Sequence, residues 1–442
     1  MANTKLTRTF SSTGNRKIFT TSFWMKRSKL GGQQPLFSTD LDNTNNNYTM
    51  FYLDGGDGIG FFNTDGGVSN VDYLTNRKLR DTNSWYHIVI VFDSTQSSGN
   101  RIKFYINGVR ETSFANSTEP NQDADNTWFN RTYEHMIGTR SYDSSTYFDG
   151  SMSHFHFIDG TAYDASYFGS TDSTTGEWKI NTSPSVTYGT NGFFILKDGN
   201  TITDSSPNSN NFSLGGGTLT KTEDCPSNVF ATLNPLINFS SSYSVSLSKG
   251  NTTLGTSVGS TDSNATPATL GMVTGKYYWE TKFEVDLGSG TAYPLTGIMA
   301  SNPALEGNFL GGFGDSYGYA GWNGTVYNTV GSTGNTGGGA TYTAGDILSM
   351  AYDADNNRLY YYKNGAIQNS GTGIVIPAAS TTALGAWFPA VGDWGDSRHV
   401  WSCNFGNGNF DGTAITTNSG NGYAGAEGAS KFNYQPPTGY SA

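Results

Sequence analysis

Hydrophobic and polar residues alternate over short stretches along most of the chain. The most regular stretch, WYHIVIVFD, is apolar at both alternate sets of positions: Ile88, Ile90 and Phe92 on one face, Val89 and Val91 on the other. A strand with one solvated face carries polar residues there, whereas a strand covered on both faces is apolar throughout. The stretch therefore predicts a strand inside a sandwich of two sheets.

The next stretch, NRIKFYINGV, predicts the second strand of a hairpin, because its Ile and Phe residues alternate with Lys and Tyr. Asn107-Gly108 then supplies the positive φ angles that a tight primed turn needs. The pattern returns as NRLYYYKNGA at residues 357–366, with Asn364-Gly365 at the turn. Because the similarity fades outside these windows, we favour one turn solution used twice over a recent duplication. The pattern does not indicate a catalytic motif.

The composition supports an all-β fold. Gly makes up 57 of 442 residues, roughly twice its usual share, and aromatic residues make up 14%. So many aromatic groups argue against disorder, because disordered chains lack groups that stabilise a core. Aromatic residues set among Gly, Asn, Ser and Thr are typical of short strands joined by tight turns. The sequence contains no apolar pattern of helical period that lasts three turns.

Charge and hydropathy exclude two classes of partner. The net charge is −11 and the chain has no block of Lys and Arg, so we expect no nucleic-acid partner, which would need a basic surface. No run of about 18 apolar residues occurs, so we expect no membrane insertion.

The cysteines and the N-terminus bear on where the protein acts. The start, MANTKLTRTFSSTGNRK, lacks the apolar core of a secretory signal. Cys225 and Cys403 are too few for a disulfide framework or a tetrahedral metal site, although the two could pair. We expect a chain made in a reducing cytoplasm, or one that leaves it without a signal. A virion component released by lysis of its host meets both conditions.

Several motifs in the first half resemble those of a known family. In order they are SFWMKRSKLGGQQPLFST, SWYHIVIVFDS, NRIKFYINGVRE and FDGSMSHFHFIDGTAY. Together they resemble a laminin-G-like domain, a concanavalin A-type lectin/glucanase sandwich, over about residues 5–215. The resemblance implies two packed antiparallel sheets, with FDGSMSHFHFIDG as the closing strand.

The second half resembles a different family, the SPRY domain, over about residues 225–442. The motifs are GKYYWETKFEV, the hairpin that ends in YKNG, FPAV and a late CNFG strand. A polar bridge, TDSSPNSNNFSLGGGTLTKTEDCPSNVFATLNPL, joins the halves, and the pairing resembles proteins of marine tailed bacteriophages, including those of cyanobacteria. We therefore predict two antiparallel β-sandwich domains of the jelly-roll, concanavalin A-like type, at residues 1–222 and 223–442.

Acidic residues on one predicted strand raise the question of catalysis. In YYWETKFEVD, Glu280, Glu284 and Asp286 fall on one face by alternation, at spacings that paired carboxylates use in glycoside hydrolysis. Lys282 interrupts the run of acids, and the segment already matches a SPRY strand. We expect a half-buried strand with a solvated charged face and predict that the chain is not an enzyme. An endoglycanase acting on marine polysaccharide remains an alternative.

Metal sites have weaker support. His154 and His156 share a strand face, but no nearby Cys or third His accompanies them, so packing is the favoured interpretation. Two loops, STDLDNTNNN and LDGGDG, offer the hard oxygen ligands that Ca²⁺ prefers, although Asp and Asn also favour turns for backbone reasons. We predict no required cofactor, with Ca²⁺ as the one candidate and Asp40, Asp42, Asp54 and Asp57 as its candidate ligands.

Ligand binding by a sandwich takes place through its loops, and sugars are bound by flat aromatic faces with amide and carboxylate groups beside them. Two stretches in the second half concentrate these features, GDSYGYAGWNGTVYN and GAWFPAVGDWGDSRHVW. The alternative is that their aromatic residues belong to the core. The predicted ligand-binding residues are Asp315, Tyr317, Trp322, Asn323, Tyr327, Asp393, Trp394, Asp396 and Arg398.

These observations favour a non-enzymatic virion surface protein of a tailed phage, either a capsid decoration or head fibre or a component of the tail fibre. Its expected partners are other virion proteins and a glycan or protein of the host surface, contacted weakly by many copies at once. The alternative is a purely structural decoration protein that binds the phage's own shell. The sequence carries no heptads and no collagen-like triplets, so it indicates no oligomeric state.

Overall fold

The computed structural model describes residues 3–140, 146–197, 199–237, 245–256, 264–286, 293–301, 309–328, 335–394, 399–417, 420 and 422–442. In this part of the chain every regular element is a β-strand or a short 3₁₀ turn, so the predicted all-β class is confirmed. The described part of the chain contains no helix long and apolar enough to cross a bilayer. Contacts divide the chain into two compact units, Met1–Thr220 with Cys225–Val229, and Lys221–Asp224 with Phe230–Ala442.

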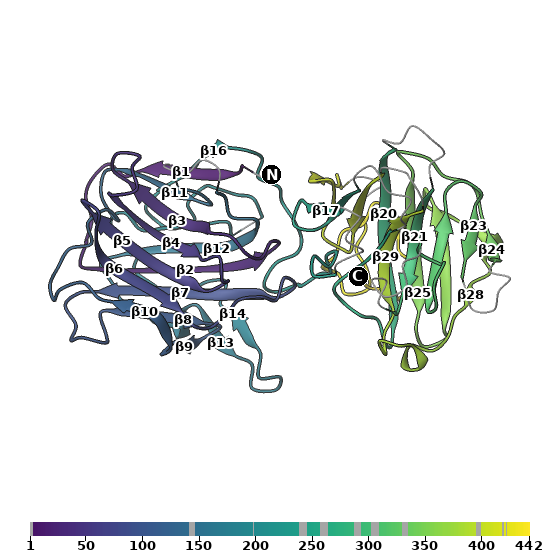
Figure 1. Ribbon diagram of the computed structural model, residues 1–442, viewed down its shortest axis with the longest axis horizontal. Helices are drawn as coiled ribbons and strands as arrows, with labels where there is room; N and C mark the ends of the chain where they lie inside the picture. The colour runs from purple at the N-terminus through teal and green to yellow at the C-terminus, as the bar shows by residue number, and fades with distance from the viewer. Residues whose placement is uncertain are drawn as a thin grey trace. The chain divides into compact units, whose positions relative to one another are not determined.

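The first unit is a sandwich of two antiparallel sheets (Figure 1). The larger sheet has the strand order β10-β6-β5-β4-β3-β11-β1-β16, the smaller has the order β15-β12-β2-β7-β8-β9, and β13 pairs with β14. The elements are β1 (Lys5–Thr9), β2 (Ile18–Arg27), β3 (Gln34–Asp40), β4 (Tyr48–Leu53), β5 (Ile59–Asp65), β6 (Val68–Thr75), β7 (Trp85–Asp93), β8 (Ile102–Ile106), β9 (Val109–Arg110), β10 (Phe114–Thr118), β11 (Glu134–Ile137), β12 (Gly150–Asp159), η1 (Ala165–Tyr167), β13 (Gly169–Thr171), β14 (Trp178–Ile180), β15 (Phe193–Ile195) and β16 (Ser213–Gly216).

Strand β7 is covered on both faces, as its sequence predicts. Ile88, Ile90 and Phe92 join the main core between the two sheets. Val89 and Val91 belong to a second cluster on the outer side of the smaller sheet, which the chain from residue 163 to residue 194 covers. The aromatic residues predicted from composition fill the main core. Phe19 and Phe92 of the smaller sheet stack with centroids 4.9 Å apart, and Phe37 of the larger sheet contacts Phe155 of the smaller at 5.5 Å.

The second unit is also a sandwich of antiparallel sheets. One sheet has the order β17-β18-β30-β20-β25-β26-β27 with β28 paired to β26, the other has the order β19-β29-β21-β22-β23-β24, and β31 pairs with β32. The elements are β17 (Val245–Ser248), β18 (Thr253–Thr256), β19 (Asn264–Pro267), β20 (Lys276–Asp286), β21 (Pro294–Met299), β22 (Ser316–Ala320), β23 (Thr325–Tyr327), β24 (Asn335–Gly338), β25 (Ile347–Asp353), β26 (Arg358–Lys363), β27 (Ala366–Ile367), η2 (Asn369–Gly371), β28 (Ile374–Val375), η3 (Ala379–Thr381), β29 (Phe388–Asp393), β30 (His399–Asn404), β31 (Asn409–Phe410) and β32 (Thr413–Ala414).

The two Asn-Gly turns have nearly the same backbone. The φ angles are 48° and 78° at Asn107 and Gly108, and 48° and 79° at Asn364 and Gly365. Each Asn side chain accepts a hydrogen bond from the neighbouring strand, from β7 at 2.8 Å in the first unit and from β25 at 2.9 Å in the second. The predicted primed turns are confirmed, and each closes a short hairpin, β8–β9 or β26–β27.

The polar bridge predicted between the halves is more ordered than its composition indicates. Its first part belongs to the first unit, because β16 pairs with β1 and the Asp204 carboxylate accepts hydrogen bonds from the backbone N–H groups of Phe194, Ser206 and Asn210. Cys225 and Cys403 are both free thiols, so the two do not pair. The hydrogen bonds of Asp204 show that the small polar residues of this segment form an ordered turn and not a loose linker.

Candidate ligand-binding site

The predicted loop residues of the second unit separate into two groups, because they flank opposite ends of β22. Asp315 precedes the strand and Trp322 follows it, while Ser316 pairs with Met299 and Ala320 pairs with Leu295 of β21. At about 3.3 Å per residue, a five-residue strand keeps its two ends more than about 13 Å apart. Asp315 therefore does not belong to the group around Trp322.

Two further predictions fail because the side chains are buried. Tyr317 is only 4% exposed and packs edge-on against Trp387 in the core between the sheets, so the alternative interpretation of a core residue holds. Asp393 is fully buried, and its carboxylate lies 3.8 Å from the His399 imidazole. Asp396 and Arg398 lie outside the described residues.

The remaining predicted aromatic residues come together in one aromatic cluster, defined here as Tyr293, Phe309, Trp322, Tyr327 and Trp394. Trp394 stacks on Phe309 with ring centroids 4.7 Å apart, and Trp322 stacks on Tyr327 at 5.5 Å. Tyr293 contacts both tryptophans, at 5.0 Å from Trp322 and 5.4 Å from Trp394. The five rings form a continuous aromatic group built from four separate parts of the chain.

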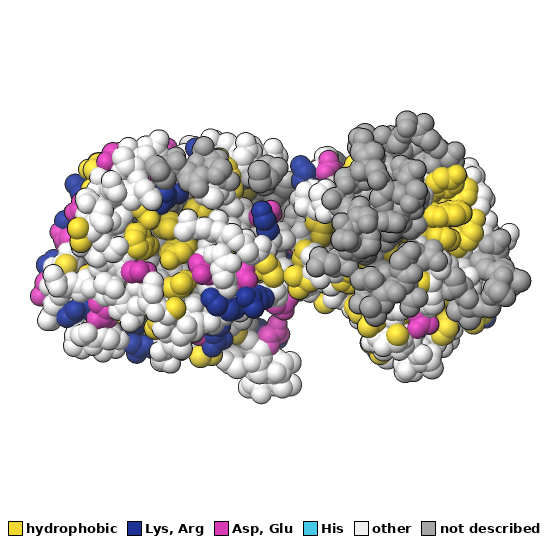
Figure 2. All heavy atoms as spheres, viewed as in Figure 1, with side chains coloured by type: hydrophobic (Ala, Val, Ile, Leu, Met, Phe, Trp, Pro, Cys, Tyr) yellow, Lys and Arg dark blue, Asp and Glu magenta, His cyan; other side chains and the backbone are white. Residues whose placement is uncertain are grey.

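The aromatic cluster is half-exposed. Trp394 is 39% exposed, and the other four rings have intermediate exposure. Phe309, Trp322 and Tyr327 pack on a small apolar layer that includes Leu295 and Leu310, on the outer side of the sheet that contains β21 and β22. Figure 2 shows hydrophobic side chains gathered at the surface of the second unit near β23, the strand that ends at Tyr327.

One amide group lies beside these rings. Asn323 is exposed, and its side-chain N–H donates to the Tyr327 hydroxyl at 2.8 Å. Its carbonyl oxygen accepts from the Thr325 N–H at 3.0 Å, which holds the turn between β22 and β23. Of the nine predicted residues, the structure thus brings together Trp322, Asn323, Tyr327 and Trp394.

Sequence reasoning missed Tyr293 and Phe309. Both follow stretches rich in Gly, Ser or Asn, SGTAY and GNF, which is the same signal that singled out Trp394. The signal was present, but each residue stands alone, whereas the predicted stretches carry several aromatic residues together.

The carboxylates of YYWETKFEVD do not share one solvated face, so that prediction is wrong. Glu280 is fully buried, and its carboxylate accepts hydrogen bonds from the segment around Asn433. A bulge between Phe283 and Val285 changes which residues face outward, and Val285 is 39% exposed although alternation predicts it inside. Glu284 pairs with Lys282 at 2.5 Å on the strand's outer side.

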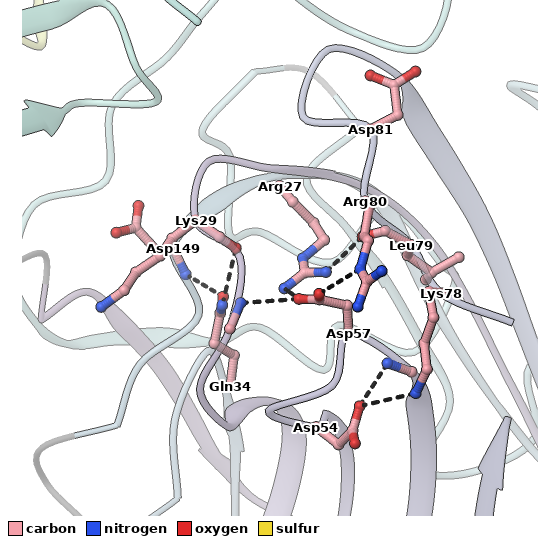
Figure 3. Close-up of polar contacts among 12 residues, drawn as sticks. Arg27, Lys29, Gln34, Asp54, Asp57, Lys78, Leu79, Arg80, Asp81 and Asp149 are labelled. Carbon is pink, nitrogen blue, oxygen red and sulfur yellow. Dashed lines mark hydrogen bonds and ion pairs between the residues drawn. The ribbon is translucent and has the colours of Figure 1, made fainter. Parts of the chain in front are cut away.

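The calcium candidates make other contacts (Figure 3). The Asp57 carboxylate lies between Arg27, at 3.1 Å, and Arg80, at 2.9 Å, and accepts from the Gly31 N–H at 2.9 Å. Burial raises the pKa of Asp57, but these donors outweigh it and keep the pKa below its ordinary value. Asp54 faces Lys78 at 4.0 Å and accepts from a backbone N–H of its own loop.

The other two calcium candidates are separate from this ion-pair centre. Asp42 is exposed and accepts hydrogen bonds from Thr44 and Asn47, so it stabilises its own turn, while Asp40 is buried at the end of β3. Among the residues that the structure describes, no three His, Cys, Asp or Glu side chains are close enough to share a metal ion. Calcium binding by these loops stays a prediction.

The histidines of the first unit pack in its interior. His156 stacks on Phe194 at 3.9 Å, and its Nδ1 lies 2.9 Å from the Tyr188 hydroxyl. Burial lowers its pKa well below the ordinary value, so the ring is neutral at pH 7. His154 lies beside the same Phe194 ring, at 5.7 Å. Both contacts agree with the favoured interpretation of packing.

Comparisons with known proteins agree with the fold. Residues 3–166 match the Laminin_G_3 family, described as the concanavalin A-like lectin/glucanases superfamily. The first unit is therefore similar to this superfamily over these residues, in agreement with its sandwich fold. No curated protein matches the chain significantly.

Solved structures that resemble parts of the chain include the SPRY domain of human HERC1, at 15% identity, covering 39% of this chain and 96% of that one with a TM-score of 0.29. A second human SPRY domain is 18% identical and covers 36% of this chain and 93% of that one, with a TM-score of 0.29. A pentraxin from Limulus polyphemus is 15% identical and covers 35% of this chain and 69% of that one, with a TM-score of 0.26. Scores this low add no weight to the assignment of function.

Proposed function

We propose that the chain is a non-enzymatic surface protein of a tailed-phage virion that binds a glycan or protein of the host surface. It acts in many copies, as a capsid decoration, a head fibre or a tail-fibre component. In this proposal it is made in the host cytoplasm, released by lysis and attached to other virion proteins. It contacts neither nucleic acid nor the interior of a membrane.

The observation that carries the proposal is the half-exposed aromatic cluster of the second unit. The unit has a core of its own between its sheets, and the cluster lies outside that core. Flat aromatic faces stack on the apolar faces of sugar rings, and a neighbouring amide such as that of Asn323 can hydrogen-bond a hydroxyl group. The lectin/glucanase-type domain in the first unit supports the same class of function.

The buried state of Glu280 supports a binding role over catalysis. Glycoside hydrolysis needs two carboxyl groups that both reach the substrate. Glu280 is fully buried and accepts four hydrogen bonds from protein groups, so it offers no access to a sugar. Its neighbour Glu284 is paired with Lys282. The phage assignment itself rests on the resemblance of the paired domains and their bridge to phage proteins.

The proposal is tested on a glycan array with the purified full chain displayed in many copies, since single sugar sites are weak. We expect W394A and W322A to reduce binding at least tenfold, about 1.4 kcal/mol, because each removes a stacking face. Y167A is the matched control, because Tyr167 is an exposed ring of the first unit, 43% exposed and 4.5 Å from Tyr163.

Three results would contradict parts of the proposal. Unchanged glycan binding by W394A and W322A removes the aromatic cluster as the site. Binding to purified virion shells, but to no glycan or host protein, indicates the structural decoration protein instead. Release of reducing ends from laminarin or agarose, abolished in E284Q, indicates the endoglycanase.

A further inference from the structure

The last residues of the chain cover the outer face of the sheet that contains β20, β25 and β26. We call residues 431–442 the C-terminal strap. Strand β20 begins at Lys276, but its pairing with β30 begins only at Glu280, which leaves residues 276–279 without a partner in β30. Ser441 fills this edge, because its carbonyl accepts from the Tyr278 N–H at 2.7 Å and its N–H donates to the Lys276 carbonyl at 3.0 Å.

Apolar contacts hold the C-terminal strap on the same face. Phe432 is fully buried, and its ring lies edge-on to Tyr278 with centroids 4.8 Å apart. Tyr440 is 7% exposed and belongs to the same cluster, together with Ala351 of β25. The C-terminal strap therefore buries aromatic surface that the sheet would otherwise expose to water.

At the centre of this interface lies the carboxylate of Glu280. It accepts hydrogen bonds from the Asn433 N–H at 2.8 Å and from the Tyr434 N–H at 2.7 Å, both in the C-terminal strap. The sheet provides two more donors, the Asn404 amide at 3.1 Å and the Tyr278 hydroxyl at 3.3 Å. Because two donors are backbone groups of the C-terminal strap, this one side chain bonds directly to the main chain that covers it.

We propose that the C-terminal strap is a releasable element, and that the proton on the Glu280 carboxyl group controls how tightly it docks on the sheet. Tyr278 and Tyr434 are the titratable residues that contact this carboxyl group, from its own strand and from the C-terminal strap. Among the described residues, no Lys, Arg or His side chain contacts it. In the described part of the chain, therefore, no contacting positive charge offsets its ionised form.

The sign of the effect follows from burial. Burial raises the pKa of Glu280 from 4.5 to about 7, and the four donors only partly oppose it. When the C-terminal strap leaves, the carboxyl group meets water and its pKa returns toward the ordinary value. The docked state therefore binds the proton more tightly, so docking is strongest below pH 4.5 and weakens as the pH rises through 7.

The experiment is hydrogen exchange of the full chain at pH 5 and pH 8, corrected for the intrinsic exchange rates and read on peptides from the C-terminal strap and from β25. We expect protection of the C-terminal strap to fall about 10- to 300-fold at pH 8, since each pKa unit of difference changes the docking equilibrium about tenfold. Protection of the β25 peptide should change less. Equal protection of the C-terminal strap at both pH values overturns the proposal.

A variant separates the carboxyl group from general effects of pH. In E280Q one carboxyl oxygen becomes an N–H₂ group, which faces a backbone N–H of the C-terminal strap with no acceptor between them. We expect E280Q to lose protection of the C-terminal strap at both pH values and to lose the pH dependence. E284Q, on the same strand and paired only to Lys282, should behave like the wild type.

One outcome with E280Q contradicts the proposal, and a second leaves the decision to the wild-type protein. If E280Q keeps both the protection and its pH dependence, the carboxyl group is not the control. If E280Q unfolds throughout, the β25 peptide loses protection as well, and the wild-type pH series then decides alone.

Discussion

The two units cover their Asn-Gly turns in different ways. A Cβ atom on Gly108 would lie 2.4 Å from the Trp178 ring, and one on Gly365 would lie 2.7 Å from the Tyr434 ring, so each Asn-Gly turn is covered by an aromatic ring from later in the chain. In the first unit the covering ring belongs to β14, whereas in the second it belongs to the C-terminal strap. The two Asn-Gly sequences therefore adopt the same turn backbone, whereas the aromatic rings that cover the turns come from unrelated parts of the chain.

The covers also differ in the ionisable group beneath them. His87 Nδ1 accepts from the Trp178 Nε1–H at 3.0 Å, so Nε2 carries the proton and donates to the Ser22 hydroxyl at 2.9 Å. Burial lowers the pKa of His87 to about 3, whereas burial raises the pKa of Glu280 to about 7. Folding favours the neutral form of both groups. Neutral histidine has lost a proton, whereas neutral glutamic acid has kept one, so the two covers respond to pH in opposite directions.

The largest predicted difference between the two units is therefore in their stability in acid, where they change in opposite directions. The unfolded chain protonates His87 below about pH 6.5, but the folded unit resists it, so the first unit loses stability as the pH falls below 6.5, by roughly 3 kcal/mol at pH 4. Over the window from pH 7 to 4.5, Glu280 adds stability to the second unit. Urea unfolding read by hydrogen exchange of β7 and β25 peptides measures both, and parallel loss in the two units would break the comparison.

A second difference is the ion-pair centre of the first unit. D57N should cost about 3–5 kcal/mol, because it leaves the fully buried Arg27 guanidinium without its charged partner. The matched change in the second unit, D353N, should cost about 1 kcal/mol or less, because its partner Lys276 is 38% exposed. Urea unfolding of each variant, resolved by unit, checks this, and equal costs would show that burial of the cation is irrelevant.

The smallest effect concerns the turns themselves. Alanine at either glycine meets the same backbone cost of about 1–2 kcal/mol, because both φ angles are positive. G108A should cost about 1 kcal/mol more than G365A, since it displaces Trp178 and breaks its bond to His87, whereas Tyr434 lies on the C-terminal strap and can shift. Thermal unfolding of the two variants decides, and a larger cost for G365A would reverse the interpretation.

Local features of the sequence predicted the fold well. The alternation in β7 and the two Asn-Gly turns depend on neighbouring residues, and both appear as predicted. Trp322 and Trp394 were found because a large ring among Gly, Asn and Asp is unusual unless the ring is exposed. Tyr317 shares that setting but lies in a strand, where its neighbours do not report which face is covered.

The rest depended on contacts between distant parts of the chain. Glu280 was predicted to be solvated because alternation cannot show that residues 153 and 154 positions later would cover it. In the same way, His87 is covered by Trp178, 91 positions later. The bulge beside Glu284 also has no mark in the alternation, so the outward position of Val285 could not be inferred.

The turn asparagines also affect how the protein ages. When glycine follows asparagine, the glycine backbone nitrogen can attack the side-chain amide, which closes a succinimide ring and expels ammonia. Water then opens the ring and leaves a carboxylate. Here Asn107 and Asn364 accept bonds from strand N–H groups, and Asn364 also donates to Asp346 at 2.7 Å, so hydrogen bonds fix the orientation of both side-chain amides. Slow deamidation at either position would therefore record how often its hairpin has opened during storage.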